Sequence, residues 1–343
     1  MLARYRWFLL WLACVYAGWL FLVLYHHAWS EIAQRWGISI AMLFGSFVAG
    51  STPMGGGTIG FPVLVVLFDG PASLGRDFGL AIQSVGMVSA SIFILSRRQP
   101  LAWNVLWPAM VGSAVGLLVG LTYIAPAVDD LVVKLTFAVI WASFGLMTLY
   151  RLGELQSMHA VADPATPLRL AMAATIGLLG GVVSSITGVG IDMLIYALLV
   201  MYDRCDLRIA IPTSVLLMAG TSLMGVMLRS GLAAVGWLPE GFSSELFYYW
   251  LAAAPVVALG APCGALVVSR IGRVPVLVFV ALLCVWQYVW IAWDSQLALA
   301  PLAISLAAIG LLFGVFNWLH GLKGGTMETP LLPANIATES PPD

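Results

Sequence analysis

The chain is a series of long apolar runs separated by short polar turns. An α-helix rises 1.5 Å per residue, so about 20 apolar residues cross the roughly 30 Å hydrocarbon layer of a membrane. The first run, 7–29, is too long for the core of a signal peptide and lacks a small-x-small cleavage site, so we interpret it as a span. Further spans are predicted at 78–96, 103–125, 131–150, 207–228, 246–269, 274–293 and 297–319.

Two other apolar stretches, 38–68 and 168–202, are too long for one upright helix and are interrupted near their centres. The interruption reads GSTPMGGG at 50–57 and TGVGID at 187–192. Each stretch is either a tilted broken span or a re-entrant hairpin that dips to the midplane and returns to the same side. The two interruptions look like two copies of one structural feature.

Basic residues favour the hairpin interpretation, because cytoplasmic loops of membrane proteins are rich in Lys and Arg. With two hairpins and a cytoplasmic N-terminus, the residues placed inside are Arg97, Arg98, Arg151, Arg169, Arg204, Arg208, Arg270, Arg273 and Lys323. The residues placed outside are Asp129, Asp130, Glu240, Glu245 and Asp294, with Arg35, Arg76, Lys134 and Arg229 as exceptions. If the first stretch crossed the membrane, Arg97 and Arg98 would move outside.

This topology predicts an all-α polytopic membrane protein built from an inverted repeat. Each unit is a re-entrant, broken helical hairpin followed by three transmembrane helices, an odd number of crossings, so the second unit is upside down relative to the first. Inverted repeats around broken helices are typical of secondary transporters. The predicted parts are an N-terminal span at 1–37, repeats at 38–150 and 168–293, a cytoplasmic linker at 151–167, a C-terminal span at 294–320 and a disordered tail at 321–343.

Internal similarity supports the duplication. At one constant shift, the glycines 45, 55 and 57 of the first stretch align with Gly180, Gly190 and Asp192 of the second. A short polar turn follows each stretch. We also match the segment 82–85, which contains Gln83 and Ser84, with the segment 212–215, which contains Thr213 and Ser214.

The composition agrees with a membrane protein and excludes other classes. Hydrophobic residues make up 61% of the chain and charged residues 9%, against about 25% charged in soluble domains. Lys and Arg are scattered at the ends of apolar runs, whereas nucleic-acid binding needs a clustered basic face. The four cysteines lack metal-ligand or CxxC spacing, so we interpret them as small apolar residues. We expect no cofactor and no metal.

Asp192 is the main candidate for chemistry, because a carboxylate inside an apolar stretch is costly and is by default a functional-site hypothesis. Three roles are open: a proton carrier, a ligand to a coupling cation such as Na+, or a cap of the second half-helix. Arg208 either pairs with it, attracts anions or anchors the topology.

Around the two interruptions the sequence predicts an anion site. Glycines let the backbone approach a ligand, and the free N–H groups at a half-helix start point toward it. The alternative is that small residues only allow close helix packing and that hydroxyls bond to their own helix. The predicted substrate-binding residues are Ser51, Thr52, Gly55, Gly56, Gly57, Gln83, Ser84, Ser185, Thr187, Gly188, Gly190, Thr213 and Ser214, together with Ser184 as a further hydroxyl donor and with Asp192 for ion coupling.

At these residues the chain resembles the sulfite exporter TauE/SafE family of membrane transporters. Its glycine-rich pattern appears as PMGGGTIGFP at 53–62 and, more weakly, as GVGID at 188–192; an A-x-x-T-S-like helix start appears at 210–214 and loosely at 81–84. The chain departs from the pattern at Pro53, which replaces a glycine, and at Ile191 and Asp192, which replace two. The resemblance covers about 38–293 and implies export of small sulfur-containing or organic anions.

The prediction is therefore a secondary transporter of a small organic or sulfur-oxo anion such as sulfite or a sulfonate, working as an exporter in the cell inner membrane and coupled to H+ or Na+. Both termini are expected in the cytoplasm. An anion channel is one alternative. An intramembrane aspartyl protease is another, but the spacing Gly188-x-Gly190-x-Asp192 is one residue too long for GxGD, and Tyr202-Asp203 follows it, whereas the YD motif of such proteases precedes it. Rhomboid-like chemistry needs an intramembrane Ser and His, yet the four histidines lie in or beside loops. We expect no enzyme activity.

Overall fold

The computed structural model describes residues 2–153, 166–238, 241–271 and 274–322. Within these residues the regular structure is helical, with no β-strand. The expected linker at 151–167 and tail at 321–343 fall almost entirely outside the described residues, as do Glu240, Arg273 and Lys323.

The described helices follow the apolar runs. In chain order they are α1 Leu2–Tyr25, α2 Trp29–Gln34, α3 Trp36–Ser51, α4 Gly57–Pro62, η1 Val63–Leu67, α5 Ala72–Ser96, α6 Trp103–Val119, η2 Gly120–Ile124, η3 Ala125–Ala127, α7 Asp130–Tyr150, α9 Pro167–Thr187, α10 Ile191–Ala197, η4 Leu198–Tyr202, α11 Leu207–Ala234, α12 Ser244–Ile271, α13 Val274–Asp294 and α14 Leu299–Leu322. Among the described residues, nine helices are long and apolar enough to cross a membrane. The polytopic membrane class is therefore confirmed.

The N-terminal region differs from its prediction. A single span was expected at 7–29, but α1 ends at Tyr25 and a turn separates it from the short helix α2. His27 has a positive φ of 49°, a backbone conformation that stops a right-handed helix. The predicted run extends to Trp29 across His26 and His27, and these two polar residues lie at the turn.

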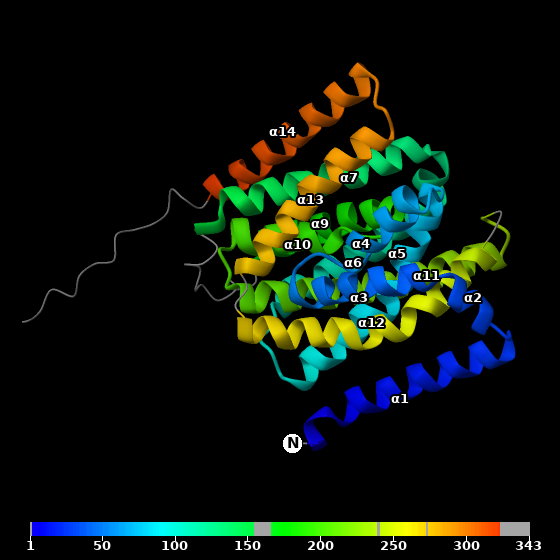
Figure 1. The fold of residues 1–343 in the computed structure, drawn as a ribbon. Helices are drawn as coiled ribbons and strands as arrows, with labels where there is room; N and C mark the ends of the chain where they lie inside the picture. Colours follow the sequence, from blue (N-terminus) through cyan, green and yellow to red (C-terminus); the bar gives the residue numbers. More distant parts are fainter. Residues whose placement is uncertain (1, 154–165, 239–240, 272–273, 323–343) are drawn as a thin grey trace, which may run out of the picture.

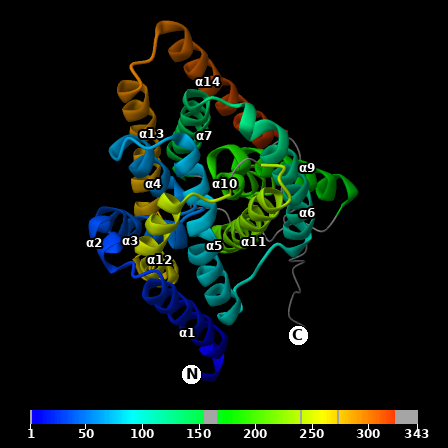
Figure 2. The same ribbon diagram turned by 90° about the vertical axis from the view of Figure 1, so that its right-hand side faces the viewer.

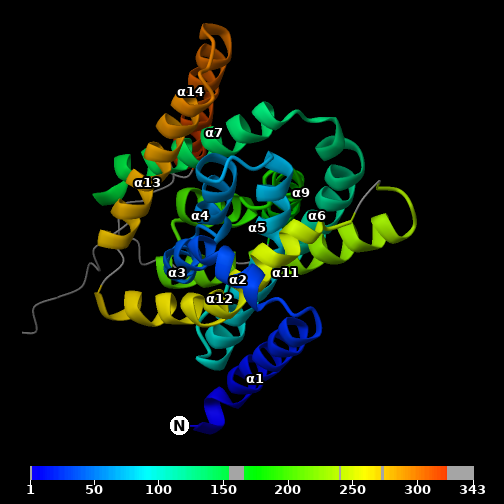
Figure 3. The same ribbon diagram turned by 45° about the vertical axis from the view of Figure 1, so that its right-hand side comes forward.

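Helix pairing places the two halves of the chain against each other. α3 packs on α12, α6 on α9, α5 on α11 and α7 on α13. α1 packs on α5 and α12, whereas α14 packs on α7. In Figure 1, Figure 2 and Figure 3, α1 and α14 lie at opposite edges of the molecule, with α5, α10 and α11 between them. The two terminal helices are thus peripheral to the body of the protein.

Small residues bring the paired helices close together. A Cβ added at Gly177 of α9 would lie 2.1 Å from the carbonyl oxygen of Ala109 in α6, and one at Gly50 of α3 would lie 1.7 Å from that of Ala261 in α12. Side chains at these positions would clash, so glycine is required for the observed approach. Close backbone contact of this kind is how helices associate where water supplies no hydrophobic force between them.

The two interrupted stretches have matching backbones 135 residues apart. The π-helical segments η1 and η4 begin at Val63 and Leu198, and the following long helices begin at Ala72 and Leu207. Asp69 and Arg204, also 135 residues apart, both have positive φ, 53° and 52°. The similarity extends beyond the glycines to features that the residue types do not show.

The same register changes one sequence match. Because α5 starts at Ala72 and α11 at Leu207, the counterpart of Gln83 under this register is Met218. Thr213 is only the seventh residue of α11, whereas Gln83 is the twelfth of α5. The match of the segment 82–85 with the segment 212–215 is therefore displaced by five residues from the structural register.

The two ends of each interrupted stretch touch. At the second stretch, Arg169 near the start of α9 donates to Asp203, which follows η4, and the Nη2–Oδ2 distance is 2.6 Å. At the first, a Cβ on Gly37 near the start of α3 would lie 3.1 Å from the ring of Phe68, which follows η1. Phe68 and Asp203 are themselves 135 residues apart. The end of each interrupted stretch thus lies near its start.

Candidate substrate site at the two helix interruptions

A threonine ends the first helix of each interrupted stretch in the same way. Thr52 Oγ1 donates to the Val48 carbonyl at 2.8 Å and accepts from Met54 N–H at 3.3 Å. Thr187 Oγ1 lies 3.0 Å from the Val183 carbonyl oxygen and 2.8 Å from the Val189 carbonyl oxygen, to either of which it donates, and the Val189 nitrogen lies 3.5 Å from it. Both hydroxyls bond the backbone of the last helical turn and of the residues just beyond it, which offers a structural reason for threonine at both positions.

The second interruption turns on two glycines in left-handed conformations, Gly188 with φ +80° and Gly190 with φ +115°. Gly188 also packs directly on α5, because an added Cβ would lie 2.2 Å from the Arg76 carbonyl oxygen. Other residues at these positions are strained. The interruption therefore depends on glycine for its shape, in addition to any role toward a ligand.

Asp192 lies in the first turn of α10 and is completely buried. Its Oδ1 accepts a hydrogen bond from Met193 N–H at 3.0 Å, and the backbone N–H of Gly55 from the first interruption also faces the carboxyl group. Oδ2 has no hydrogen-bond partner among the described residues. Asp192 thus lies where the two interruptions meet. Of its two carboxyl oxygens, only Oδ1 is hydrogen-bonded to the start of its own half-helix.

Gln83 of α5 joins both interruptions. Its Nε2 donates to the carbonyl oxygens of Gly79 at 3.1 Å and Gly188 at 3.2 Å. Its Oε1 points at Gly55, where an added Cβ would lie only 2.0 Å from it. Gln83, Gly55, Gly188 and Asp192, four of the predicted site residues, are therefore brought together.

Gly57 and Gly56 belong to the same neighbourhood. A Cβ on Gly57 would lie 3.1 Å from Gln83 Nε2, and Gly56 lines a small cavity that Gln83 also lines. That cavity, shared with Met42 of α3 and Val257 of α12, has about 10 Å³ of free volume, the space of about one water molecule. A sulfite-sized anion therefore needs a rearrangement of these helices to enter.

Several predicted hydroxyl groups are occupied by backbone of their own helices. The acceptors are carbonyl oxygens three or four residues earlier for Ser51, Ser84, Ser185, Thr213 and Ser214. Thr213 also accepts from Ala102 N–H at 3.0 Å, so it fastens the loop before α6 and does not contact the interruptions. Ser184, by contrast, is buried and its Oγ has no hydrogen-bond partner among the described residues.

Three residues beside the interruptions escaped the sequence reasoning. Trp141 of α7 donates through Nε1 to Thr58 Oγ1 at 2.9 Å, and Gln287 of α13 donates through Nε2 to the Thr58 carbonyl at 2.8 Å. The ring of Trp141 also lies 3.3 Å from the Cβ position of Gly190. The sequence signal that could have found Gln287 is a glutamine in the middle of an apolar run, where it is as costly as Gln83.

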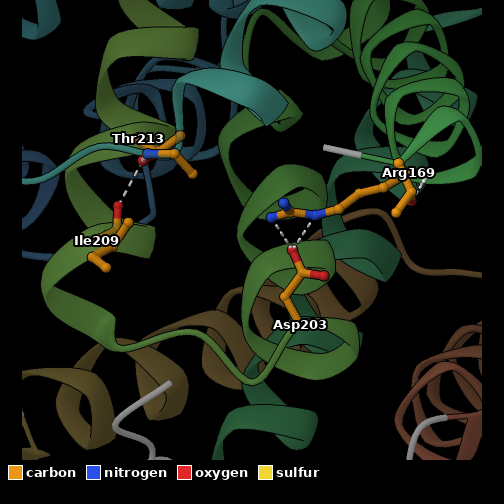
Figure 4. A network of polar contacts seen from close by, with 6 residues as sticks. Arg169, Asp203, Ile209 and Thr213 are labelled. Atoms are coloured by element: carbon orange, nitrogen blue, oxygen red, sulfur yellow. Dashed lines mark hydrogen bonds and ion pairs between the residues drawn. The ribbon is translucent and has the colours of Figure 1, made fainter. Parts of the chain in front are cut away.

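Charged residues are buried at two places away from Asp192. Asp77 of α5 accepts from Arg76 Nε at 2.8 Å and from Arg229 Nη2 of α11 at 2.7 Å. Arg169 and Asp203 form the other pair, shown in Figure 4 beside Thr213 and Ile209. Burial raises the pKa of Asp203, and the Arg169 guanidinium opposes that rise. Arg208 is exposed, so the interpretation that it pairs with the fully buried Asp192 is wrong.

Comparison of the sequence with known families decides the broad function. Residues 38–289 match the profile described as sulfite exporter TauE/SafE, which is more than half of the chain. The chain belongs to the sulfite exporter TauE/SafE family. It is accordingly a membrane transporter by family, as the glycine-rich pattern predicted, and the matched region contains both interruptions and α5, α10 and α11. Comparison with curated proteins and with solved structures gives no match.

Proposed function

We propose that this protein is a secondary transporter that exports a small organic or sulfur-oxo anion, such as sulfite or a sulfonate, across the cytoplasmic membrane, coupled to H+ or Na+. The observation that carries the proposal is the meeting of Gly55, Gln83 and Asp192 where two interrupted helices end in the protein core. Half-helix starts expose N–H groups and a positive dipole end, which suit an anion.

The proposal includes an inverted repeat with two re-entrant hairpins. Its support is the 135-residue register and the contact between the two ends of each interrupted stretch, Gly37 with Phe68 and Arg169 with Asp203. Three long helices follow each hairpin, so the number of crossings in each unit is odd. The basic residues Arg97 and Arg98 then fall on the cytoplasmic side with both termini.

The closed arrangement at Gly56 favours alternating access over a continuously open pore. With about 10 Å³ of free volume beside Gly56 and Gln83, passage of an anion requires helix movement in each cycle. An anion channel with a closed gate is the second candidate. The two are separated by kinetics: a transporter shows saturable counter-exchange, whereas a channel passes a current that the exchange partner does not stimulate.

The test is an uptake screen in proteoliposomes with labelled sulfite, sulfonates and carboxylates, each with and without a pH gradient and a Na+ gradient. We expect saturable uptake of at least one sulfur-oxo or organic anion that a gradient accelerates. No uptake of any of these anions by a monodisperse, correctly inserted protein would contradict the proposal.

A further inference from the structure

Two buried oxygen atoms, Gln83 Oε1 and Asp192 Oδ2, lie near each other where the interruptions meet. The position of a Cβ on Gly55 is 2.0 Å from Gln83 Oε1 and 3.0 Å from Asp192 Oδ2, so the two oxygens are at most 5.0 Å apart, the sum of these distances. Neither accepts a hydrogen bond from the described residues. Two acceptor oxygens brought together in a dry interior repel each other unless a proton or a cation lies between them.

The amide orientation of Gln83 is set by its partners. Its nitrogen lies 3.1 Å from the Gly79 carbonyl oxygen and 3.2 Å from that of Gly188. Carbonyl oxygens only accept, so the group facing them has to be the NH2 and the group facing Asp192 has to be the oxygen. Rotating the amide would break two hydrogen bonds and place two pairs of acceptors in contact.

Asp192 differs from the other buried carboxylates of the described residues in having no cationic partner. Asp77 is paired with Arg76 and Arg229, and Asp203 with Arg169. The remaining charges on the helices around it are at helix ends or exposed: Arg208 on α11, Asp130 and Lys134 on α7, and Glu245 and Arg270 on α12, whereas α3 and α4 carry none. A carboxyl group buried without a counter-charge takes up a proton to avoid the cost of an isolated charge.

We propose that Asp192 and Gln83 form a proton-binding site, in which Asp192 is a neutral carboxylic acid whose Oδ2–H donates to Gln83 Oε1. The neighbouring groups disfavour a cation in the same place. Backbone N–H groups of Gly55, Gly190 and Met193 face the carboxyl, whereas Na+ needs a shell of oxygen atoms. Gln83 is then the partner of the proton and not a ligand of the substrate.

The proposed proton site joins segments of the protein that have to move during transport. Gln83 is on α5, Asp192 on α10 and Gly55 in the first interruption, so loss of the proton replaces an attraction with a repulsion between the two halves of the protein. A neutral Asp192 also removes the repulsion that a carboxylate would exert on an anion beside Gly56. Its role in transport rests on the proposed function, and it predicts that proton and anion travel in the same direction.

The proton itself is tested by infrared spectroscopy of the purified full-length protein in a maltoside detergent, which has no carbonyl group of its own. Exposed carboxyls are ionised at pH 7, so the C=O stretch of a protonated carboxyl there reports a buried acid. We expect this band in the wild type, a shift in D2O, and its loss in Asp192→Asn. In Gln83→Leu the band should move to higher wavenumber or vanish at pH 7.

Gln287→Leu is the matched control, because Gln287 is also buried and donates to one carbonyl, and its Oε1 has no hydrogen-bond partner in the part of the chain that the structure describes, but it lies next to Thr58. The carboxyl band should be unchanged in this variant. No band in a folded wild type, a band that survives in both Asp192→Asn and Asp192→Gly, or Na+-specific stabilisation against a choline control that Asp192→Asn abolishes would each overturn the proposal. Since no substrate is used, failure of the proton site is distinguishable from failure of anion transport.

Discussion

Arg169 and Asp203 hold the two ends of the second interrupted stretch together through one carboxylate oxygen. Arg169 donates to Asp203 Oδ2 from Nη2 at 2.6 Å and from Nε at 3.0 Å, and both side chains are almost fully buried. The residues are 34 positions apart and enclose α9, α10 and η4. This ion pair joins the start of α9 to the residue that follows η4, and so closes the base of the proposed hairpin.

Removing the Asp203 charge should destabilise the protein strongly. Breaking a buried ion pair from one side leaves an uncompensated charge and costs about 3–5 kcal/mol. We expect Asp203→Asn to lower the melting temperature in detergent, whereas Glu31→Gln, which breaks a partly exposed pair with Arg35, should cost no more than about 1 kcal/mol. Equal melting temperatures for the two variants would show that the Arg169–Asp203 pair does not secure the hairpin.

The thiol of Cys205 should report whether this base is closed. Cys205 is buried, and its burial, with a smaller contribution from Asp203, raises the pKa of the thiol to about 11. Relative to an ordinary thiol, the reactive thiolate is then on the order of a hundredfold scarcer at neutral pH. Measured by mass spectrometry, alkylation of Cys205 should be slow in the wild type and faster in Asp203→Asn. Equal rates would argue against opening at this place.

Re-entry of the first stretch predicts a common face for Ser30 and Ser73. Both are exposed and lie just before α3 and just after η1, so cysteine at either position is a conservative change. In a background without native cysteines, an impermeant maleimide should label both from outside intact cells. Thr166→Cys should be protected until the membrane is permeabilised. Labelling of Ser30→Cys and Ser73→Cys from opposite faces would end the inverted-repeat proposal.

Adding a side chain at Gly56 or at Gly190 should impair the protein for different reasons. Gly56 has an ordinary helical φ of −58° and lines the small cavity, so Gly56→Leu should abolish transport with a moderate overpacking cost of about 1–3 kcal/mol. Gly190 has φ +115°, so both Gly190→Leu and Gly190→Ala should lower stability through backbone strain. Transport and melting measured together separate the effects. Full transport by Gly56→Leu would remove Gly56 from the substrate path.

Asp192→Asn separates the three roles predicted for this residue. If Asp192 carries the coupling proton, the variant mimics the protonated state, so anion exchange should survive and accumulation toward the alkaline compartment should vanish. If Asp192 only caps α10, both activities should persist, because asparagine is a comparably good cap. If it binds Na+, the Na+ requirement should rise sharply. Exchange and gradient-driven uptake are measured on the same proteoliposomes, and wild-type behaviour in both would exclude a coupling role.

The membrane class, the long helices and the positions of both interruptions follow from the amino-acid sequence alone. Hydrophobic length decides which segments cross a membrane, and glycine and proline mark where a helix cannot continue, so these properties are local. The glycine-rich pattern also identified the family. The sequence further singled out Asp192, because a carboxylate in an apolar stretch is conspicuous wherever the helix faces.

Which polar groups meet depends on how the helices pack against one another. The helices are apolar on all sides, so no pattern indicates which face is turned inward, and a hydroxyl can bond its own helix as readily as a ligand. Thr213 therefore fastens Ala102 instead of joining the site, while Gln83 reaches both interruptions. The contact of Gln83 with Gly55 and Asp192 joins α5, the first interruption and α10. Packing of these three segments against one another, which no local pattern encodes, brings the oxygens of Gln83 and Asp192 together.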